Sequence, residues 1–172
     1  AVAEIALYTE RRALQDQDSP NGPSVGTVGV MQVPQGSVNV VPGRCQFTLD
    51  LRAPTNRQRD ELVEDVDAFV YTVARRRGVE IELIQNLQAS AAPSDPAWRA
   101  RWEAAVTSLG LPVFHLPSGA GHDAMKLHQV MPQAMRFVRG GHDGISHNPL
   151  ETITNDDAQL CVDAFMHLLD AI

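Results

Sequence analysis

Residues 44–78 decide the fold class, and they read RCQFTLDLRAPTNRQRDELVEDVDAFVYTVARRRG. The first nine residues alternate, with Cys45, Phe47, Leu49 and Leu51 on one face and polar side chains on the other, which predicts a half-buried strand. From residue 56 to residue 77 the apolar side chains recur at helical spacing, and Gly78 ends the pattern. A strand with one buried face, followed by an amphipathic helix, predicts an α+β layer with helices on one side of a sheet.

The residues around this stretch extend the same layer. Residues 1–14 have helical spacing, residues 16–23 are dense in turn formers, and residues 27–33 and 79–87 are expected to be further strands. This order predicts a small βαβ-type unit with a four-stranded sheet over residues 1–88. Because Ala1 opens the first helix without an N-cap, we expect the domain to be incomplete at its N-terminus.

A second region begins after the proline-containing linker 89–95. Asp95 or Ser94 caps a predicted helix that starts at Pro96 and ends at Gly110, and a Thr154–Asp157 capping box opens a closing helix. Between these helices, residues 112–116 and 131–138 are short apolar runs that favour strands. Alternating helices and strands over residues 89–172 predict part of a parallel α/β sheet.

Composition restricts the kinds of partner. The 172 residues are 44% apolar and 20% charged, and the formal net charge of −7 argues against binding to a phosphate backbone. No apolar run reaches the roughly 20 residues that a membrane span needs, and no signal segment opens the chain. Cys45 and Cys161 lack the CxxC spacing of structural zinc sites. We therefore expect no nucleic-acid or membrane partner, reduced thiols and a cytoplasmic protein.

Three segments carry side chains suited to chemistry. The first is SGAGHDA at residues 118–124, a glycine-rich turn in which the backbone can approach a ligand closely. The alternative interpretation of this segment is a tight turn that His122 and Asp123 cap locally.

The second segment is GGHDGISHNP at residues 140–149, where glycine, histidine and aspartate follow an apolar run, as in loops that carry sites at strand ends. Imidazole and carboxylate groups are common metal ligands, although a single loop histidine does not define a metal.

The third segment pairs Asn39 with Arg52. Asn39 opens a turn and Arg52 ends the polar face of the strand, so both side chains could lie on the same side of the sheet. The guanidinium of arginine offers a planar fork of donors that matches a carboxylate, and the asparagine amide offers a donor and an acceptor. The alternative is an ordinary turn at Asn39 and a surface pairing between Arg52 and Asp50.

Four motifs, SVNVVPG, FTLDLR, SGAGHDA and GISHNPLE, occur in an order and at a spacing that resemble the hydantoinase/carbamoylase family. This family contains N-carbamoyl-L-amino-acid hydrolases, ureidopropionases and allantoate amidohydrolases, within the aminoacylase/metallocarboxypeptidase superfamily. The resemblance runs from about Val25 to the end and implies the C-terminal portion of such an enzyme. It implies α/β architecture with an α+β lid: a small helix-on-sheet lid and dimerisation domain at residues 1–88, then the C-terminal part of the catalytic α/β domain at residues 89–172.

The resemblance also implies the chemistry. The family hydrolyses linear amide or ureido C–N bonds with two divalent metal ions, zinc or manganese, and a glutamate general base. By motif, His147 resembles the family's C-terminal metal ligand, Asn39 and Arg52 resemble the lid residues that hold the substrate carboxylate, and Gly121 and His122 resemble part of the substrate-facing loop. The implied partners are a small carbamoyl or ureido acid and a second copy bound through the lid.

The chain departs from the family in what it lacks. The motifs that carry the remaining metal ligands and the general base are not present in the 172 residues, so we expect no catalytic residue in this chain and no activity from it alone. Two alternatives remain at this stage. One is a stand-alone binding or oligomerisation module derived from the lid, and the other is a phosphohydrolase that uses His122 and Asp123.

Overall fold

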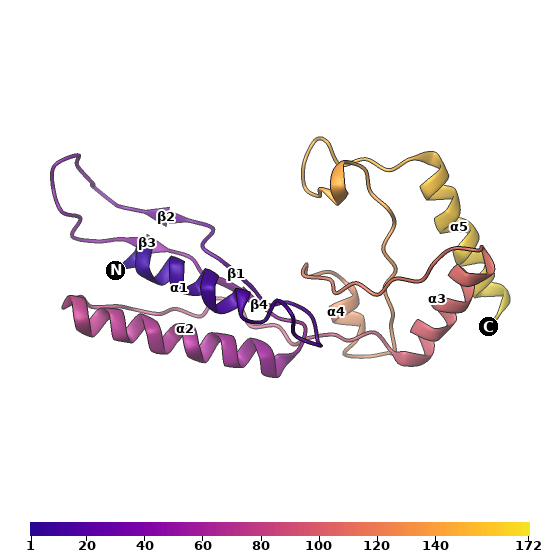
Figure 1. Cartoon of the computed structure of the whole chain (residues 1–172), viewed down its shortest axis with the longest axis horizontal. Coiled ribbons are helices and arrows are strands. Elements are labelled where there is room, and N and C mark those ends of the chain that lie inside the picture. Colours follow the sequence, from indigo (N-terminus) through magenta and orange to yellow (C-terminus); the bar gives the residue numbers. More distant parts are fainter. The chain divides into compact units, whose positions relative to one another are not determined.

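The computed structural model describes residues 1–172, and contacts between Cα atoms divide them into two compact units. The first unit contains Ala1–Ala91 together with Pro117–Gly121, and the second contains Ala92–Leu116 and His122–Ile172. Figure 1 shows the helices and strands of each unit. No helix in either unit is both long and apolar enough to cross a bilayer.

Two helices, α1 (Val2–Leu14) and α2 (Asn56–Arg77), pack side by side in the first unit (Figure 1). The Thr55 side chain caps α2 by accepting a hydrogen bond from the backbone N–H of Gln58 at 3.2 Å. Gly78 ends the helix in the left-handed conformation, at a φ of 63°. The predicted bounds of α2 are confirmed, because periodicity, an N-cap and a terminal glycine all agree.

The core of the first unit lies along one stripe of α2. Leu62, Val66, Val70 and Val73 are completely buried, together with Ile5 of α1. Their spacing of three or four residues places them on one face of the helix, and each buried side chain of this size contributes about 1.5–3 kcal/mol. Further apolar side chains from both helices, the strands and the connecting segments surround this stripe: Tyr8, Phe47, Leu49, Leu51, Phe69 and Ile81.

The strands are shorter than the sequence predicts. β1 (Val25–Thr27) pairs antiparallel with β4 (Asp50–Arg52), and β2 (Met31–Gln32) pairs antiparallel with β3 (Gln46–Phe47). The expected strands 27–33 and 44–52 are interrupted at residues 28–30 and 48–49, where Thr48 contacts Val30 through a backbone bond of 3.0 Å from its N–H and a bond of 3.1 Å from the Val30 N–H to its hydroxyl. The expectation of one four-stranded sheet is therefore wrong, and two two-stranded sheets form instead.

The prediction of a third strand in this unit, at residues 79–87, is also wrong. These residues form no ladder, and only the N-terminal part of the segment packs on the core, through Ile81. Ile84 and Leu87 are 70% and 83% exposed. β-Branched and apolar composition favours an extended backbone, but a strand also needs hydrogen bonds to a neighbouring strand, and this segment forms no ladder with any strand.

The second unit is built on α3 (Pro96–Ser108) and α5 (Asn155–Asp170), which pack against each other. The Asp95 carboxylate caps α3, and the Thr154 hydroxyl accepts from the Asp157 N–H at 3.1 Å, which confirms both predicted caps. The rings of Trp102 and Phe165 stack between the helices with centroids 5.8 Å apart. Two short helices complete the unit, α4 (Ala124–Leu127) and the 3₁₀ turn η1 (His142–Gly144).

The strands predicted at residues 112–116 and 131–138 are absent. Both segments lack ladder partners, and Phe114 remains 80% exposed and Phe137 50% exposed. The reason is the same as for residues 79–87, because an apolar extended segment becomes a strand only when another strand accepts its hydrogen bonds. The second unit therefore carries the helices of the expected α/β arrangement without a sheet.

Candidate functional site

Arg52 stands at the end of β4, and its guanidinium is fixed by two acceptors of the first unit. The Nε and Nη2 atoms donate to Oδ1 and Oδ2 of Asp50 at 2.7 and 2.6 Å. The Nη1 atom donates to the backbone carbonyl of Gly119 at 2.8 Å. Three of the five guanidinium N–H groups are thereby engaged, and two remain for a ligand.

The electrostatics of this pair follow from its hydrogen bonds. The guanidinium of Arg52 holds the pKa of Asp50 below its ordinary value, against the opposing effect of partial burial, and the carboxylate in turn raises the pKa of Arg52. Both side chains are about half exposed. The pair is therefore ionised and open to solvent, which are the conditions under which a carboxylate-bearing small molecule could reach the guanidinium.

Asn39 lies in the loop that joins β2 to β3 and is exposed. Its Oδ1 atom accepts from the Ser37 hydroxyl at 3.3 Å, an interaction local to the turn. The loop extends away from β1 and β4 (Figure 1), so the first unit does not bring Asn39 and Arg52 together. Common placement on one side of a sheet would require a continuous ladder, and the sheet is interrupted between these residues.

The SGAGHDA segment contacts Arg52 through Gly119, a contact that the sequence does not signal because 67 residues separate the two. Within the segment, the Nδ1 atom of His122 accepts from the Ala124 N–H at 3.0 Å and not from Asp123. Accepting at Nδ1 leaves the Nε2 atom as the N–H donor of a neutral ring. The exposed backbone of Gly121 and the His122 ring are therefore accessible, and His122 also plays the local capping role expected as its alternative.

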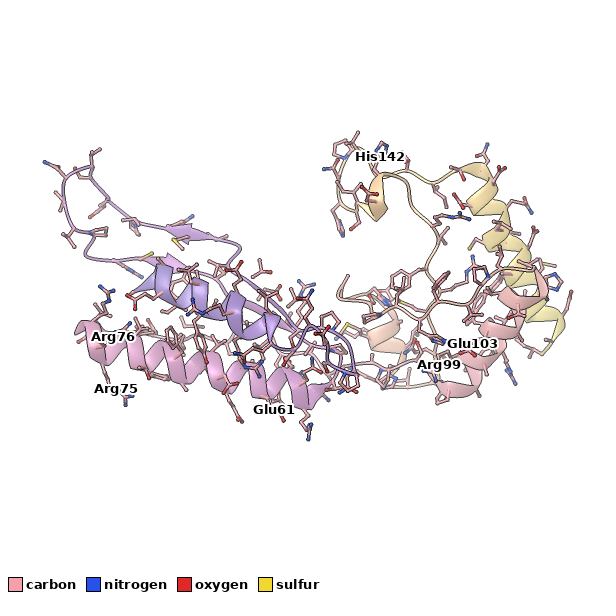
Figure 2. All side chains as sticks on the ribbon, viewed as in Figure 1. Glu61, Arg75, Arg76, Arg99, Glu103 and His142 are labelled. Atoms are coloured by element: carbon pink, nitrogen blue, oxygen red, sulfur yellow. The ribbon has the colours of Figure 1, made fainter.

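His147 lies in the loop of residues 140–152, which precedes α5 and includes the labelled His142 in Figure 2. A hydrogen bond of 2.8 Å from the Gly141 N–H to the Thr152 carbonyl joins the two ends of this loop. A Cβ atom at residue 141 would stand 2.6 Å from the Thr152 hydroxyl, so any larger residue would force the Thr152 side chain to shift. His142, Asp143 and His147 all have positive φ angles, of 49°, 58° and 55°. Such a concentration of strained residues is typical of functional loops.

The residues present do not make a complete metal site. No group of three or more histidine, cysteine, aspartate or glutamate side chains converges anywhere in the chain. His147 is exposed, and its backbone N–H donates to Oε2 of Glu151 at 2.9 Å. Since a divalent metal ion in a protein takes about four ligands or more, this chain does not supply a complete ligand set by itself.

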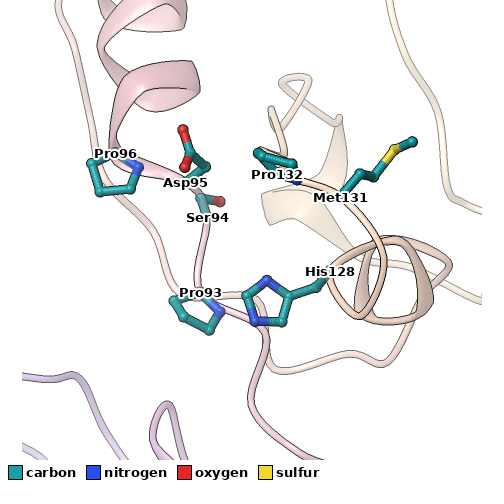
Figure 3. Close-up of a pocket in the computed structure, with 7 residues that line it drawn as sticks. All are labelled: Pro93, Ser94, Asp95, Pro96, His128, Met131 and Pro132. Atoms are coloured by element: carbon teal, nitrogen blue, oxygen red, sulfur yellow. The ribbon is translucent and has the colours of Figure 1, made fainter.

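A cavity of about 310 Å³ lies elsewhere in the second unit (Figure 3). Prolines and Met131 make much of its wall, and the Asp95 carboxylate is already used as the cap of α3. Figure 3 shows four lining residues on one side and three on the other: Pro93, Ser94, Asp95 and Pro96, and then His128, Met131 and Pro132. None of the predicted site residues borders this cavity.

Comparison with known proteins identifies the family. Residues 10–171 match the model of peptidase family M20/M25/M40. The chain belongs to this family. Its similarity to hydantoinase/carbamoylase amidases, expected from the four motifs, is confirmed by both relatives and solved structures.

Among curated M20 relatives, an N-carbamoyl-L-amino acid amidohydrolase of Geobacillus stearothermophilus is 34% identical over 97% of this chain and 39% of its own length. A protein of the same description from Pseudomonas sp. (strain NS671) is 32% identical over 90% of the chain and 36% of its own length. An allantoate deiminase of Arabidopsis thaliana is 31% identical over 86% of the chain and 29% of its own length.

Solved structures agree. An amidase of the hydantoinase/carbamoylase family from Burkholderia multivorans superposes with a TM-score of 0.89 at 33% identity. A putative amidohydrolase/peptidase from Burkholderia cenocepacia gives a TM-score of 0.84 at 32% identity. In both comparisons 98% of this chain matches 40% of the other chain. The mixed fold of helices and small sheets is therefore that of the hydantoinase/carbamoylase amidases, and the chain spans about two fifths of the length of these relatives.

Proposed function

We propose that the protein containing this chain hydrolyses the C–N bond of linear, non-peptide amides, with N-carbamoyl amino acids or related ureido acids as substrates. The observation that carries the proposal is the fixed guanidinium of Arg52, in a chain whose M20 relatives include N-carbamoyl-L-amino acid amidohydrolases. Two N–H groups of this guanidinium are free of protein acceptors, and a bidentate contact with a carboxylate needs two.

The proposed roles of the chain's own residues follow from their chemistry. Arg52 binds the substrate carboxylate, and Asn39 adds an amide donor and acceptor to the same group. Because the first unit does not bring these two residues together, they act jointly only if Asn39 and Arg52 meet the substrate from different copies or after movement of the β2–β3 loop. Gly121 and His122 face the substrate from the SGAGHDA segment, where backbone and Nε2–H are accessible.

Metal ions enter the proposal through His147 alone. We propose that its imidazole supplies one ligand to a site of two zinc or manganese ions, and that the remaining ligands and the general base lie outside residues 1–172. A polypeptide of residues 1–172 alone is accordingly expected to be inactive toward carbamoyl amino acids.

The remaining proposals concern assembly and location. We propose that the unit built on α1 and α2 is a lid that also forms a homodimer, and that the region from residue 89 onward belongs to the catalytic domain. Cys45 and Cys161 are both free thiols, which supports a reducing compartment such as the cytoplasm.

The test uses the natural-length protein loaded with zinc or manganese. Release of free amino acid is measured from a panel of N-carbamoyl-L-amino acids, allantoate and N-formyl amino acids. Arg52→Ala is expected to raise KM by about 10- to 100-fold, because hydrogen bonds to a charged group are lost. The matched control is Arg57→Ala, which removes an exposed guanidinium with a weak ion pair to Glu61 and is expected to leave KM unchanged.

Two results would overturn the proposal. An unchanged KM for Arg52→Ala would remove Arg52 from carboxylate recognition. Failure of the metal-loaded protein to hydrolyse any member of the panel, together with dimer formation, would favour a binding or oligomerisation module instead.

A further inference from the structure

The turn that carries His147 is closed twice by the same residue, Glu151. The backbone N–H of Glu151 donates to the Asn148 carbonyl at 2.9 Å, which closes the turn from its C-terminal side. The side chain of Glu151 folds back, and its Oε2 atom accepts from the backbone N–H of His147 at 2.9 Å. Glu151 therefore contacts the N-terminal side of the turn as well, so a single residue holds both ends.

The conformation held in this way is unfavourable by itself. His147 has a φ of 55°, in the left-handed region that residues with a Cβ atom rarely adopt. Such a conformation persists only where surrounding contacts determine it, and the Glu151 carboxylate provides the hydrogen bond at the strained residue. Since φ sets the direction of the Cα–Cβ bond, the same hydrogen bond sets the direction in which the imidazole leaves the backbone.

We propose that Glu151 is a positioning residue for His147, holding the imidazole in the orientation in which it binds a metal ion. This inference rests on the proposed function, in which His147 is a metal ligand. Glu151 acts through the backbone of the ligand residue, not through its ring. His147 and Glu151 are four residues apart and belong to the same turn, so the contact is local in sequence.

The proposed role of Glu151 requires an acceptor oxygen at the correct distance from the His147 N–H. Three substitutions of Glu151 test this requirement. Glu151→Gln keeps the length and an acceptor oxygen but loses the charge. Glu151→Asp keeps the charge but is one methylene shorter and cannot reach the His147 N–H. Glu151→Ala loses both. Glu61→Ala is the matched control, because Glu61 is an exposed glutamate of α2 whose only partner is Arg57.

The experiment measures cobalt(II) binding to the natural-length protein after removal of its metal, by chelator competition and by the visible absorption of the bound ion. Contacts that orient metal ligands contribute about 10- to 100-fold to metal affinity. We expect Glu151→Asp and Glu151→Ala to weaken cobalt binding by this factor and to change the absorption of the bound ion. The cobalt affinity of Glu151→Gln should stay within about threefold of the wild type. Glu61→Ala should leave cobalt affinity unchanged.

The outcomes separate this inference from the function on which it rests. Weakened binding in His147→Ala, with wild-type binding in Glu151→Ala and Glu151→Asp, overturns the positioning role and leaves His147 as a ligand. Wild-type binding in His147→Ala removes the ligand assignment itself. Equal loss in Glu151→Gln and Glu151→Ala overturns the hydrogen-bond account, because the charge would then be the required feature. If Glu151→Ala does not fold, the comparison of Glu151→Gln with Glu151→Asp decides the question.

Discussion

The carboxylate of Asp50 accepts two hydrogen bonds from one edge of the Arg52 guanidinium, at 2.7 and 2.6 Å. The two residues are neighbours on the same face of β4, so the pair forms wherever that strand forms. A third acceptor, the Gly119 carbonyl, limits rotation of the guanidinium about the Asp50 edge. The orientation of Arg52 is thus determined by contacts within the protein, and an arginine fixed in this way loses less side-chain freedom if it binds a carboxylate, as proposed.

The first prediction concerns Asp50→Asn in the natural-length protein. Asparagine presents an amide N–H₂ to a guanidinium that has only donors, so one of the two hydrogen bonds is lost and Arg52 is no longer held at both atoms. We expect KM for a carbamoyl amino acid to rise several-fold, less than in Arg52→Ala, because about one hydrogen bond to a charged group is lost. Steady-state kinetics check this. An equal or lower KM would show that Asp50 competes with the substrate carboxylate.

The second prediction is a pH dependence of stability. The folded state lowers the pKa of Asp50, mainly through the hydrogen bond from Arg52, so folding favours the ionised carboxylate. The resulting stabilisation is present above the unfolded-state pKa of about 3.9 and is lost as the pH falls through the lower folded-state pKa. Because both side chains are half exposed, solvent screening limits this stabilisation to below about 1 kcal/mol. Denaturation of wild type and Asp50→Asn should differ by a constant amount at pH 5–7, and the difference should shrink below about pH 4.

The third prediction has the opposite sign and concerns Asp67 of α2. Partial burial raises the pKa of Asp67, and no other cause contributes. As the pH rises, the unfolded chain therefore ionises first, so the penalty on the folded state grows above the unfolded-state pKa and is complete above the higher folded-state pKa. Asp67→Asn should stabilise the protein at pH 7 by less than about 1 kcal/mol, a gain that disappears well below about pH 4.

The control for this prediction is Glu64→Gln, an exposed carboxylate of the same helix. Its free energy of unfolding should change by less than about 0.5 kcal/mol at either pH. A destabilised Asp67→Asn at pH 7 would contradict the argument, because it would show that the ionised carboxylate makes a favourable interaction in the folded state.

The fourth prediction tests the core stripe of α2. Leu62 is completely buried, and Leu62→Ala should lower the free energy of unfolding by about 2–5 kcal/mol through lost burial and the cavity left behind. Leu7 of α1 is 54% exposed, so Leu7→Ala makes the same chemical change at the surface and should cost less than about 1 kcal/mol. Chemical denaturation measures both. Similar losses in the two variants would contradict the assignment of the core.

The sequence by itself determined the helices and their ends. Apolar spacing along residues 56–77, the terminal Gly78, the Asp95 cap and the Thr154–Asp157 pair are all local signals, and each was found where it was predicted. These signals suffice because a helix makes its hydrogen bonds within one segment. The four ordered motifs also identified the family, since their spacing along the chain is itself sequence information.

Only the tertiary structure decided which extended segments became strands and what the site residues contact. Residues 79–87, 112–116 and 131–138 have strand composition but form no ladder, and a strand exists only through hydrogen bonds to another segment. The bond from Arg52 to Gly119 joins residues 67 positions apart, which no local pattern encodes. The left-handed backbone of His147 depends on where the Glu151 carboxylate lies, and a three-dimensional turn sets that position.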